Sequence, residues 1–103
     1  MKVEELKLIS YNATIQIKDI KPGMRILEWF RDEERTYIYC VEEVFKSNGE
    51  VTFYASTISR LFGRETKTTN TWCLKEDDWL TVFFETREKA LKLGIKEKDI
   101  ETS

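Results

Sequence analysis

Aromatic and cationic side chains interleave between residues 59 and 72, and their types suit the chemistry of binding. Aromatic rings stack on bases or fill apolar pockets, and guanidinium and ammonium groups pair with phosphates or carboxylates. The same residue types dominate the energetics of protein interfaces. The alternative is a structural loop whose two aromatics pack into the core. This first candidate partner-binding surface comprises Arg60, Phe62, Arg64, Lys67, Asn70 and Trp72.

A second group of aromatics lies on two neighbouring predicted strands and forms a secondary candidate surface: Tyr37, Tyr39, Phe45 and Tyr54. Such a face can stack bases or hold an extended peptide. The neighbouring carboxylates of Glu42 and Glu43 repel phosphate, which favours a basic or proline-rich protein segment over nucleic acid. The alternative is that a C-terminal helix carrying Leu91 and Leu93 covers this face.

Catalytic side chains are scarce. The chain has no histidine, which removes the commonest general base, the Ser-His-Asp arrangement and most catalytic zinc sites. Cys40 and Cys73 lack CxxC spacing and are expected to be reduced core residues. The acidic run 76–78 lacks the spaced ligands of a calcium loop and predicts a solvated turn. We therefore expect no enzymatic activity, no metal and no cofactor.

The composition indicates one small globular domain spanning residues 1–103, with 41% hydrophobic and 35% charged residues. A net charge of −2 argues against wholesale nucleic-acid binding, which depends on an excess of Lys and Arg. No apolar run is long enough to span a membrane, and the first ten residues carry acidic groups where a signal peptide is basic and apolar. A cytoplasmic protein without membrane partners is expected.

Strands are predicted where apolar and β-branched residues alternate with polar ones, at residues 11–18, 25–30, 36–45, 51–58, 72–74 and 79–84. Pro22 and Gly23 predict a tight turn after the first strand. The charged run 31–35 is expected to form an exposed connection. Residues 59–71 lose the alternation and are interpreted as a long loop or a wide hairpin.

Asn48 and Gly49 give the clearest turn signal, because a two-residue type I′ turn needs positive φ at both central positions. With that turn, Val44 lies opposite Phe53, and Glu43 lies opposite Tyr54. The same register places Cys40 opposite Thr57, and Tyr39 opposite Ile58. It predicts a core face made of Cys40, Val44, Phe53 and Ala55, with the secondary candidate surface on the other side.

The C-terminal part predicts a helix over residues 86–94, with Thr86 as its N-cap and Gly94 at its end. Ala90, Leu91 and Leu93 are expected to face the sheet, and the charged tail 95–103 is expected to fray. Trp29 and Trp79 are expected to be buried or half-buried strand residues. Together these elements predict a mainly β (α+β) fold, a small SH3-like or OB-like partly open barrel of five or six strands with one short C-terminal helix.

Residues 17–27, IKDIKPGMRIL, resemble the turn-and-strand pattern near the start of Hint-type protein-splicing domains. The resemblance covers only these eleven residues. Met1 stands in place of the nucleophilic Cys or Ser, Met24 in place of an Asp, and histidine is absent. We interpret the match as shared turn geometry.

The expected function is a non-enzymatic interaction module that docks a protein partner, for instance a phage or mobile-element accessory protein that inhibits a host protein. The alternatives are a nucleic-acid-binding barrel that uses residues 59–72 and a self-associating virion or assembly component.

Overall fold

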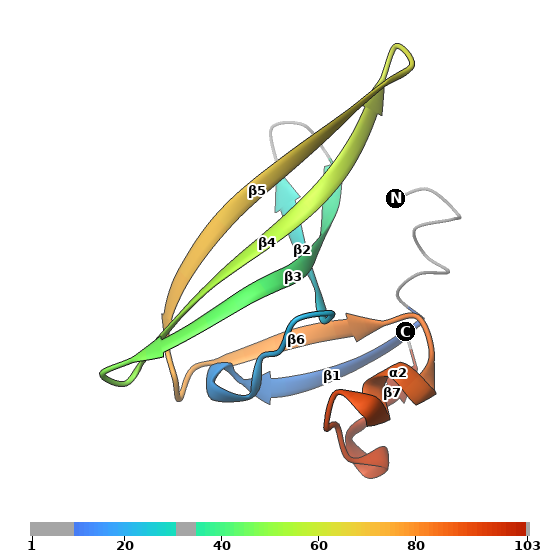
Figure 1. Cartoon of the computed structure of the whole chain (residues 1–103). Coiled ribbons are helices and arrows are strands. Elements are labelled where there is room, and N and C mark those ends of the chain that lie inside the picture. The colour runs from blue at the N-terminus through green and yellow to red at the C-terminus, as the bar shows by residue number, and fades with distance from the viewer. Residues whose placement is uncertain (1–9, 31–34, 103) are drawn as a thin grey trace.

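A computed structural model describes residues 10–30 and 35–102, and at residues 29, 30, 35, 60 and 61 it describes the backbone alone. This part of the chain forms one open antiparallel sheet in the order β5-β4-β3-β2-β6-β1-β7 (Figure 1). The strands are β1 (Tyr11–Gln16), β2 (Arg25–Phe30), β3 (Arg35–Ser47), β4 (Glu50–Leu61), β5 (Arg64–Lys75), β6 (Trp79–Phe84) and β7 (Glu101–Thr102).

One α-helix and two short 3-10 helices complete the described structure: α2 (Arg87–Lys92), η1 (Ile17–Asp19) and η3 (Glu97–Asp99). The predicted mainly β fold with a short C-terminal helix is confirmed. The sheet does not close on itself, so the predicted barrel of five or six strands describes it only approximately.

The sheet folds over so that the long strands β3, β4 and β5 stand above the β1–β6 pair (Figure 1). β2 joins the two parts, pairing along its length with β3 but meeting β6 only where Arg25 lies opposite Phe83. The core fills the space between the parts, and its largest fully buried side chains are Ile17, Met24, Val41, Val51, Phe53, Val82 and Phe84.

The first strand buries alternate side chains, as its sequence predicts, with Ala13 and Ile15 in the core. It ends two residues early because the chain turns into η1, where the Ile17 N–H donates to the Asp78 carbonyl at 2.8 Å and the Lys18 N–H to the Glu76 carbonyl at 3.0 Å. The predicted turn at Pro22 and Gly23 is confirmed, since Gly23 has a φ of 97°. Of the predicted connection 31–35, residues 31–34 lie outside the described residues.

A β-bulge in β3 overturns the predicted faces of the first hairpin. The Val44–Phe53 and Glu43–Tyr54 pairs form as predicted, but the register shifts between Val41 and Glu43, so Cys40 lies opposite Ser56 instead of Thr57. One extra residue moves every earlier side chain of the strand to the other face. Tyr39, only 3% exposed, is therefore in the core with Phe53, and Cys40 is not.

Of the two interpretations of residues 59–71, the hairpin is confirmed and the long loop is wrong. β4 and β5 pair without interruption from Glu50–Lys75 to Leu61–Arg64, and only Phe62 and Gly63 lie between them. The strands therefore continue through the stretch predicted to be irregular and form a long hairpin that projects beyond the rest of the sheet (Figure 1).

The C-terminal helix is confirmed, and the Thr86 hydroxyl accepts a hydrogen bond from the Lys89 N–H at 3.1 Å as an N-cap should. Ala90 is fully buried against the sheet and Leu93 is partly buried, but Leu91 is 43% exposed, contrary to the prediction. The prediction that the tail 95–103 frays is wrong for residues 95–102: Ile95 is buried, Glu97–Asp99 form η3, and β7 pairs with Tyr11 and Asn12 of β1.

Candidate functional site

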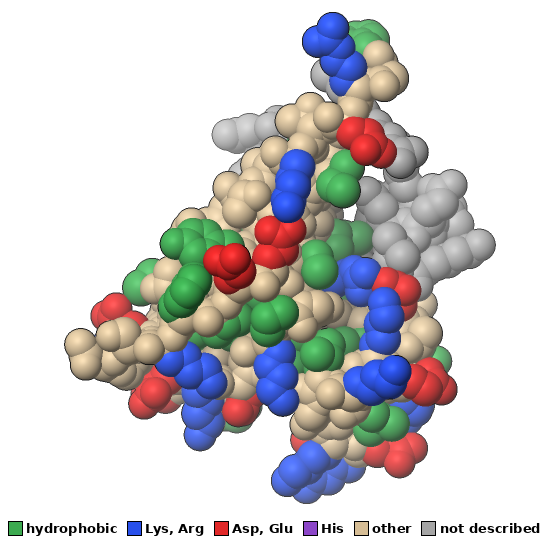
Figure 2. Space-filling view, in the orientation of Figure 1, with side chains coloured by type: hydrophobic (Ala, Val, Ile, Leu, Met, Phe, Trp, Pro, Cys, Tyr) green, Lys and Arg blue, Asp and Glu red, His purple; other side chains and the backbone are tan. Residues whose placement is uncertain are grey.

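The tip of the β4–β5 hairpin is formed by Phe62, Gly63 and Arg64. Phe62 and Gly63 have φ values of 51° and 76°, so both central residues of this two-residue turn have the positive φ of a type I′ turn. Phe62 is 95% exposed, the most exposed of the large hydrophobic residues that the structure describes. Figure 2 shows basic and hydrophobic side chains together at this end of the molecule.

Phenylalanine is an unfavourable choice for this position. The left-handed region brings Cβ close to the backbone, which costs a residue other than glycine about 1–2 kcal/mol, and short polar Asn or Asp tolerates it best. The ring gains nothing in return from packing, because it is almost entirely in water. A bulky apolar residue at a strained backbone position is an outlier that makes Phe62 a candidate for contact with a partner.

The other residues of the first candidate surface do not gather at the tip. Trp72 lies at the base of the hairpin, where its ring stacks on Phe53 at a centroid distance of 5.4 Å and meets Tyr39 edge-on at 5.3 Å. The Asn70 amide donates to the Tyr39 hydroxyl at 3.1 Å. Trp72 is therefore part of the core wall, as the structural alternative predicts, and Asn70 holds Tyr39 in place.

Lys67 lies on the outer face of the sheet, and its ammonium reaches back across β4 to the Glu42 carboxylate at 2.7 Å. The hydrogen bond from Lys67 holds the pKa of Glu42 below its usual value, helped by the charge of Lys67 and a hydrogen bond from Ser56. Arg64 is exposed next to the turn. The side chain of Arg60 lies outside the described residues, so the structure brings only Phe62 and Arg64 of the predicted set together.

The secondary candidate surface is divided by the β-bulge. Tyr39 is buried and Tyr37 packs against the core, whereas Phe45 and Tyr54 meet edge-on at 5.8 Å on the outer face, with Phe45 53% exposed. The four aromatics therefore form no continuous face. The alternative in which the C-terminal helix covers this face is not what the structure shows, because α2 packs on β6.

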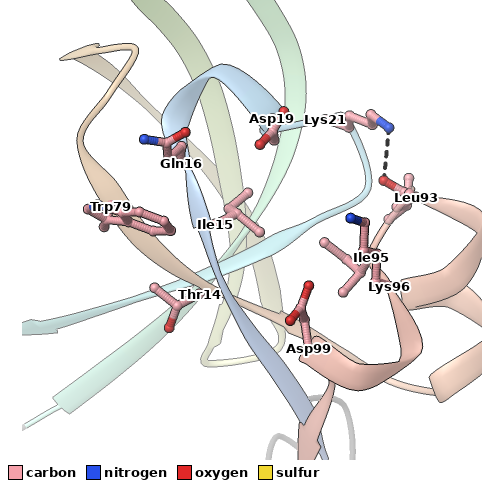
Figure 3. A pocket seen from close by; sticks show the side chains of 11 residues that line it. Thr14, Ile15, Gln16, Asp19, Lys21, Trp79, Leu93, Ile95, Lys96 and Asp99 are labelled. Carbon is pink, nitrogen blue, oxygen red and sulfur yellow. Dashed lines mark hydrogen bonds between the residues drawn. The ribbon is translucent and has the colours of Figure 1, made fainter.

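A cavity of about 390 Å³ lies between β1, η1 and the C-terminal segment (Figure 3). Lys21, on its wall, already donates to the Leu93 carbonyl at 3.0 Å. Trp79 stands at its rim and is 67% exposed, which corrects the expectation of a half-buried strand residue. The charged side chains in its wall balance one another: Asp19, Lys21, Lys96 and Asp99.

The described part of the chain holds no group of three or more His, Cys, Asp or Glu residues that could bind a metal. Cys73 is exposed and Cys40 is half-buried outside the core, so the prediction of two core cysteines is wrong for both. The predicted turn at residues 76–78 is confirmed by the hydrogen bond from the Asp78 N–H to the Lys75 carbonyl at 3.1 Å.

The comparisons with known proteins add no functional assignment: no family model, curated protein or solved structure matches the chain. Within the described residues, no helix has the length and apolar character needed to cross a membrane.

Proposed function

We propose that this chain is a non-enzymatic interaction module that docks a protein partner through the tip of its β4–β5 hairpin. Phe62 is the anchor that enters an apolar pocket of the partner, and Arg64 contacts polar or acidic groups at the rim of that pocket. The single observation that carries the proposal is the 95% exposure of a phenylalanine in a left-handed turn conformation.

The strands behind the tip suit this role. β4 and β5 pair over twelve consecutive residue pairs, so the tip is presented by a regular hairpin, whose base is held in the core by Phe53 and Trp72. Because the backbone behind the anchor is already paired, ordering it on binding costs little conformational entropy. Aromatic residues and arginine are enriched at the centres of protein interfaces.

Charge favours a protein over a nucleic acid as the partner. The chain carries a net charge of −2, and Lys67 is already paired with Glu42. Binding to a phosphate backbone needs several available cations. The cytoplasmic location and the accessory-protein role expected from the sequence stay predictions.

The test compares wild type with Phe62→Asn, which removes the ring and keeps a residue that the turn tolerates. Ile58→Thr is the matched control, because Ile58 is 64% exposed on the same hairpin and threonine is also β-branched. A partner is isolated by cross-linking capture from the native host and its binding is then measured by calorimetry with purified components. We expect Phe62→Asn to weaken binding by about thirtyfold or more, as loss of an anchor of about 2 kcal/mol does, and Ile58→Thr to change it less than about threefold.

Equal binding of Phe62→Asn and wild type to that partner would contradict the proposal. A second measurement tests the nucleic-acid alternative by fluorescence anisotropy with single- and double-stranded oligonucleotides. Protein docking predicts no binding even at low salt. Micromolar binding that weakens steeply with salt and disappears in Arg64→Glu would replace the proposal with a nucleic-acid-binding function.

A further inference from the structure

The two ends of the sheet differ in length. The described residues place β7 at one end, with only the two residues Glu101–Thr102, and β5 at the other, with twelve. Short edge strands are one way in which proteins avoid pairing with other chains, and a long edge strand needs other protection. The long outer edge of β5 is therefore a candidate for pairing with another chain.

The register identifies which backbone groups of β5 point to that edge. Leu61 and Arg64 flank the two-residue turn and so form a hydrogen-bonded pair. Hydrogen-bonded and non-hydrogen-bonded pairs alternate along an antiparallel ladder. The even-numbered residues of β5 thus bond to β4, whereas the N–H and C=O groups of Lys67, Thr69 and Thr71 point away from it.

This edge lacks the usual protective features. The segment Lys67–Thr71 contains no proline, and its pairing with β4 is continuous, so no bulge twists it away. Lys67 is the one cation in it, and its side chain turns inward across β4 to Glu42. Beyond the other end of β5, η1 hydrogen-bonds to Glu76 and Asp78. The edge-directed residues Lys67, Thr69 and Thr71 are all exposed.

We propose that this edge binds a second copy of the chain, strand against strand, in an antiparallel pair centred on Thr69. In that register each edge-directed residue meets another, because Lys67 lies opposite Thr71 of the other copy and Thr69 lies opposite itself. Three such pairs form about six backbone hydrogen bonds. The two copies are related by a two-fold axis, so the assembly is a closed dimer.

The side chains of this segment and the net charge are compatible with a second copy of the chain at this edge. A register centred on Lys67 would place two ammonium groups against each other, whereas the Thr69 register has no like-charged pair in this segment. Threonine pairs across strands are favourable, and the net charge of −2 produces little repulsion between two copies. The small contact predicts a weak dimer that dissociates on dilution.

Analytical ultracentrifugation from about 1 to about 500 µM tests the dimer, a range chosen for weak association. Wild type should move from the mass of one chain, 12.3 kDa, towards twice that value as its concentration rises. Thr69→Pro removes the central edge-directed N–H and should weaken the dimer about tenfold or more. Both substitutions also remove the Thr69 hydroxyl, which contacts the Ser56 hydroxyl. Thr69→Val keeps the backbone N–H and should therefore still dimerise.

Amide hydrogen exchange on wild type keeps the proposal testable if Thr69→Pro does not fold. On dilution, the amides of Lys67, Thr69 and Thr71 should exchange faster than those of Thr66, Thr68 and Asn70, and the difference should shrink at high concentration. A monomer at every concentration would overturn the proposal, as would a dimer in which the three edge amides stay unprotected. The dimer is independent of the proposed function, because Phe62→Asn should leave the monomer–dimer equilibrium unchanged.

Discussion

The two long hairpins of this sheet end in nearly the same backbone conformation but in different residues. Asn48 and Gly49 have φ values of 51° and 77°, and Phe62 and Gly63 have 51° and 76°. Asparagine is one of the residues that this conformation favours, whereas phenylalanine is strained there by about 1–2 kcal/mol. The first turn carries a residue that suits its conformation, and the second carries one that its conformation disfavours.

The contrast continues along the β4–β5 hairpin itself. At its base, Phe53 is completely buried and stacked on Trp72, and at its tip Phe62 is almost completely exposed. One aromatic side chain stabilises the fold through burial, and the other offers its apolar surface to the solvent. This difference separates a structural end of the hairpin from the end proposed to bind a partner.

The largest expected loss of stability concerns Phe53, at the base of the β4–β5 hairpin. Phe53→Ala should lower the free energy of unfolding by about 3–5 kcal/mol, because it removes a fully buried ring and leaves a cavity. Tyr54→Ala, on the outer face next to it, should cost less than half as much. Both values come from chemical denaturation, and similar losses for the two variants would contradict the assignment of the faces.

Asn48→Phe makes the first turn resemble the second. It should lower the free energy of unfolding by about 1–2 kcal/mol, since it introduces the strain of a bulky residue at positive φ. Thermal and urea unfolding measure the change. A variant as stable as wild type would show that phenylalanine costs no free energy of unfolding in this turn, and would contradict the strain assigned to Phe62.

A smaller effect is expected from Tyr39→Phe, which removes the hydroxyl that accepts the Asn70 amide hydrogen bond. The ring still fills the core, so the loss should be about 1 kcal/mol, the typical net value of a hydrogen bond. Urea unfolding measures it. If the unfolding curves of the variant and wild type overlaid, Asn70 would have no role in positioning Tyr39.

The smallest effect concerns Glu85, which lies away from both turns and serves as an internal control. The hydrogen bond from Lys89 and the charges of Arg25 and Lys89 hold its pKa below the usual value, against partial burial that raises it. A lowered folded-state pKa stabilises the protein above the unfolded-state pKa of about 4.3, and this contribution disappears as the pH falls through the folded-state value. Glu85→Gln should therefore be less stable than wild type at pH 7, and the difference should shrink towards pH 3. A difference independent of pH would contradict this assignment.

The sequence predicts most of the strands because their alternation reflects a buried face. It also predicts the Asn48–Gly49 turn and the Thr86 cap, where local chemistry determines the conformation. It does not predict the bulge in β3, because no glycine or proline marks it. The consequence is large, because one extra residue exchanges the positions of Tyr39 and Cys40 between the core and the outer face.

The sequence leaves a long loop and a wide hairpin as alternatives for residues 59–71, because the alternation of apolar and polar residues is lost there. Residues 64–69 are all polar and exposed, so the period of two that identifies a strand with one buried face is lost. The turn itself carries phenylalanine where its rules favour asparagine. Gly63 was the one available signal, and the departure from the expected turn residues coincides with the candidate site.

The free energy of unfolding of Phe62→Asn shows whether Phe62 contributes to the stability of the fold or is free to serve contact with a partner. The substitution gives the second turn the same residues as the first, so we predict a variant at least as stable as wild type, with a gain of about 0.5–1.5 kcal/mol in urea unfolding. A loss of about 1 kcal/mol or more would show that the ring supports the folded structure, and would contradict the account.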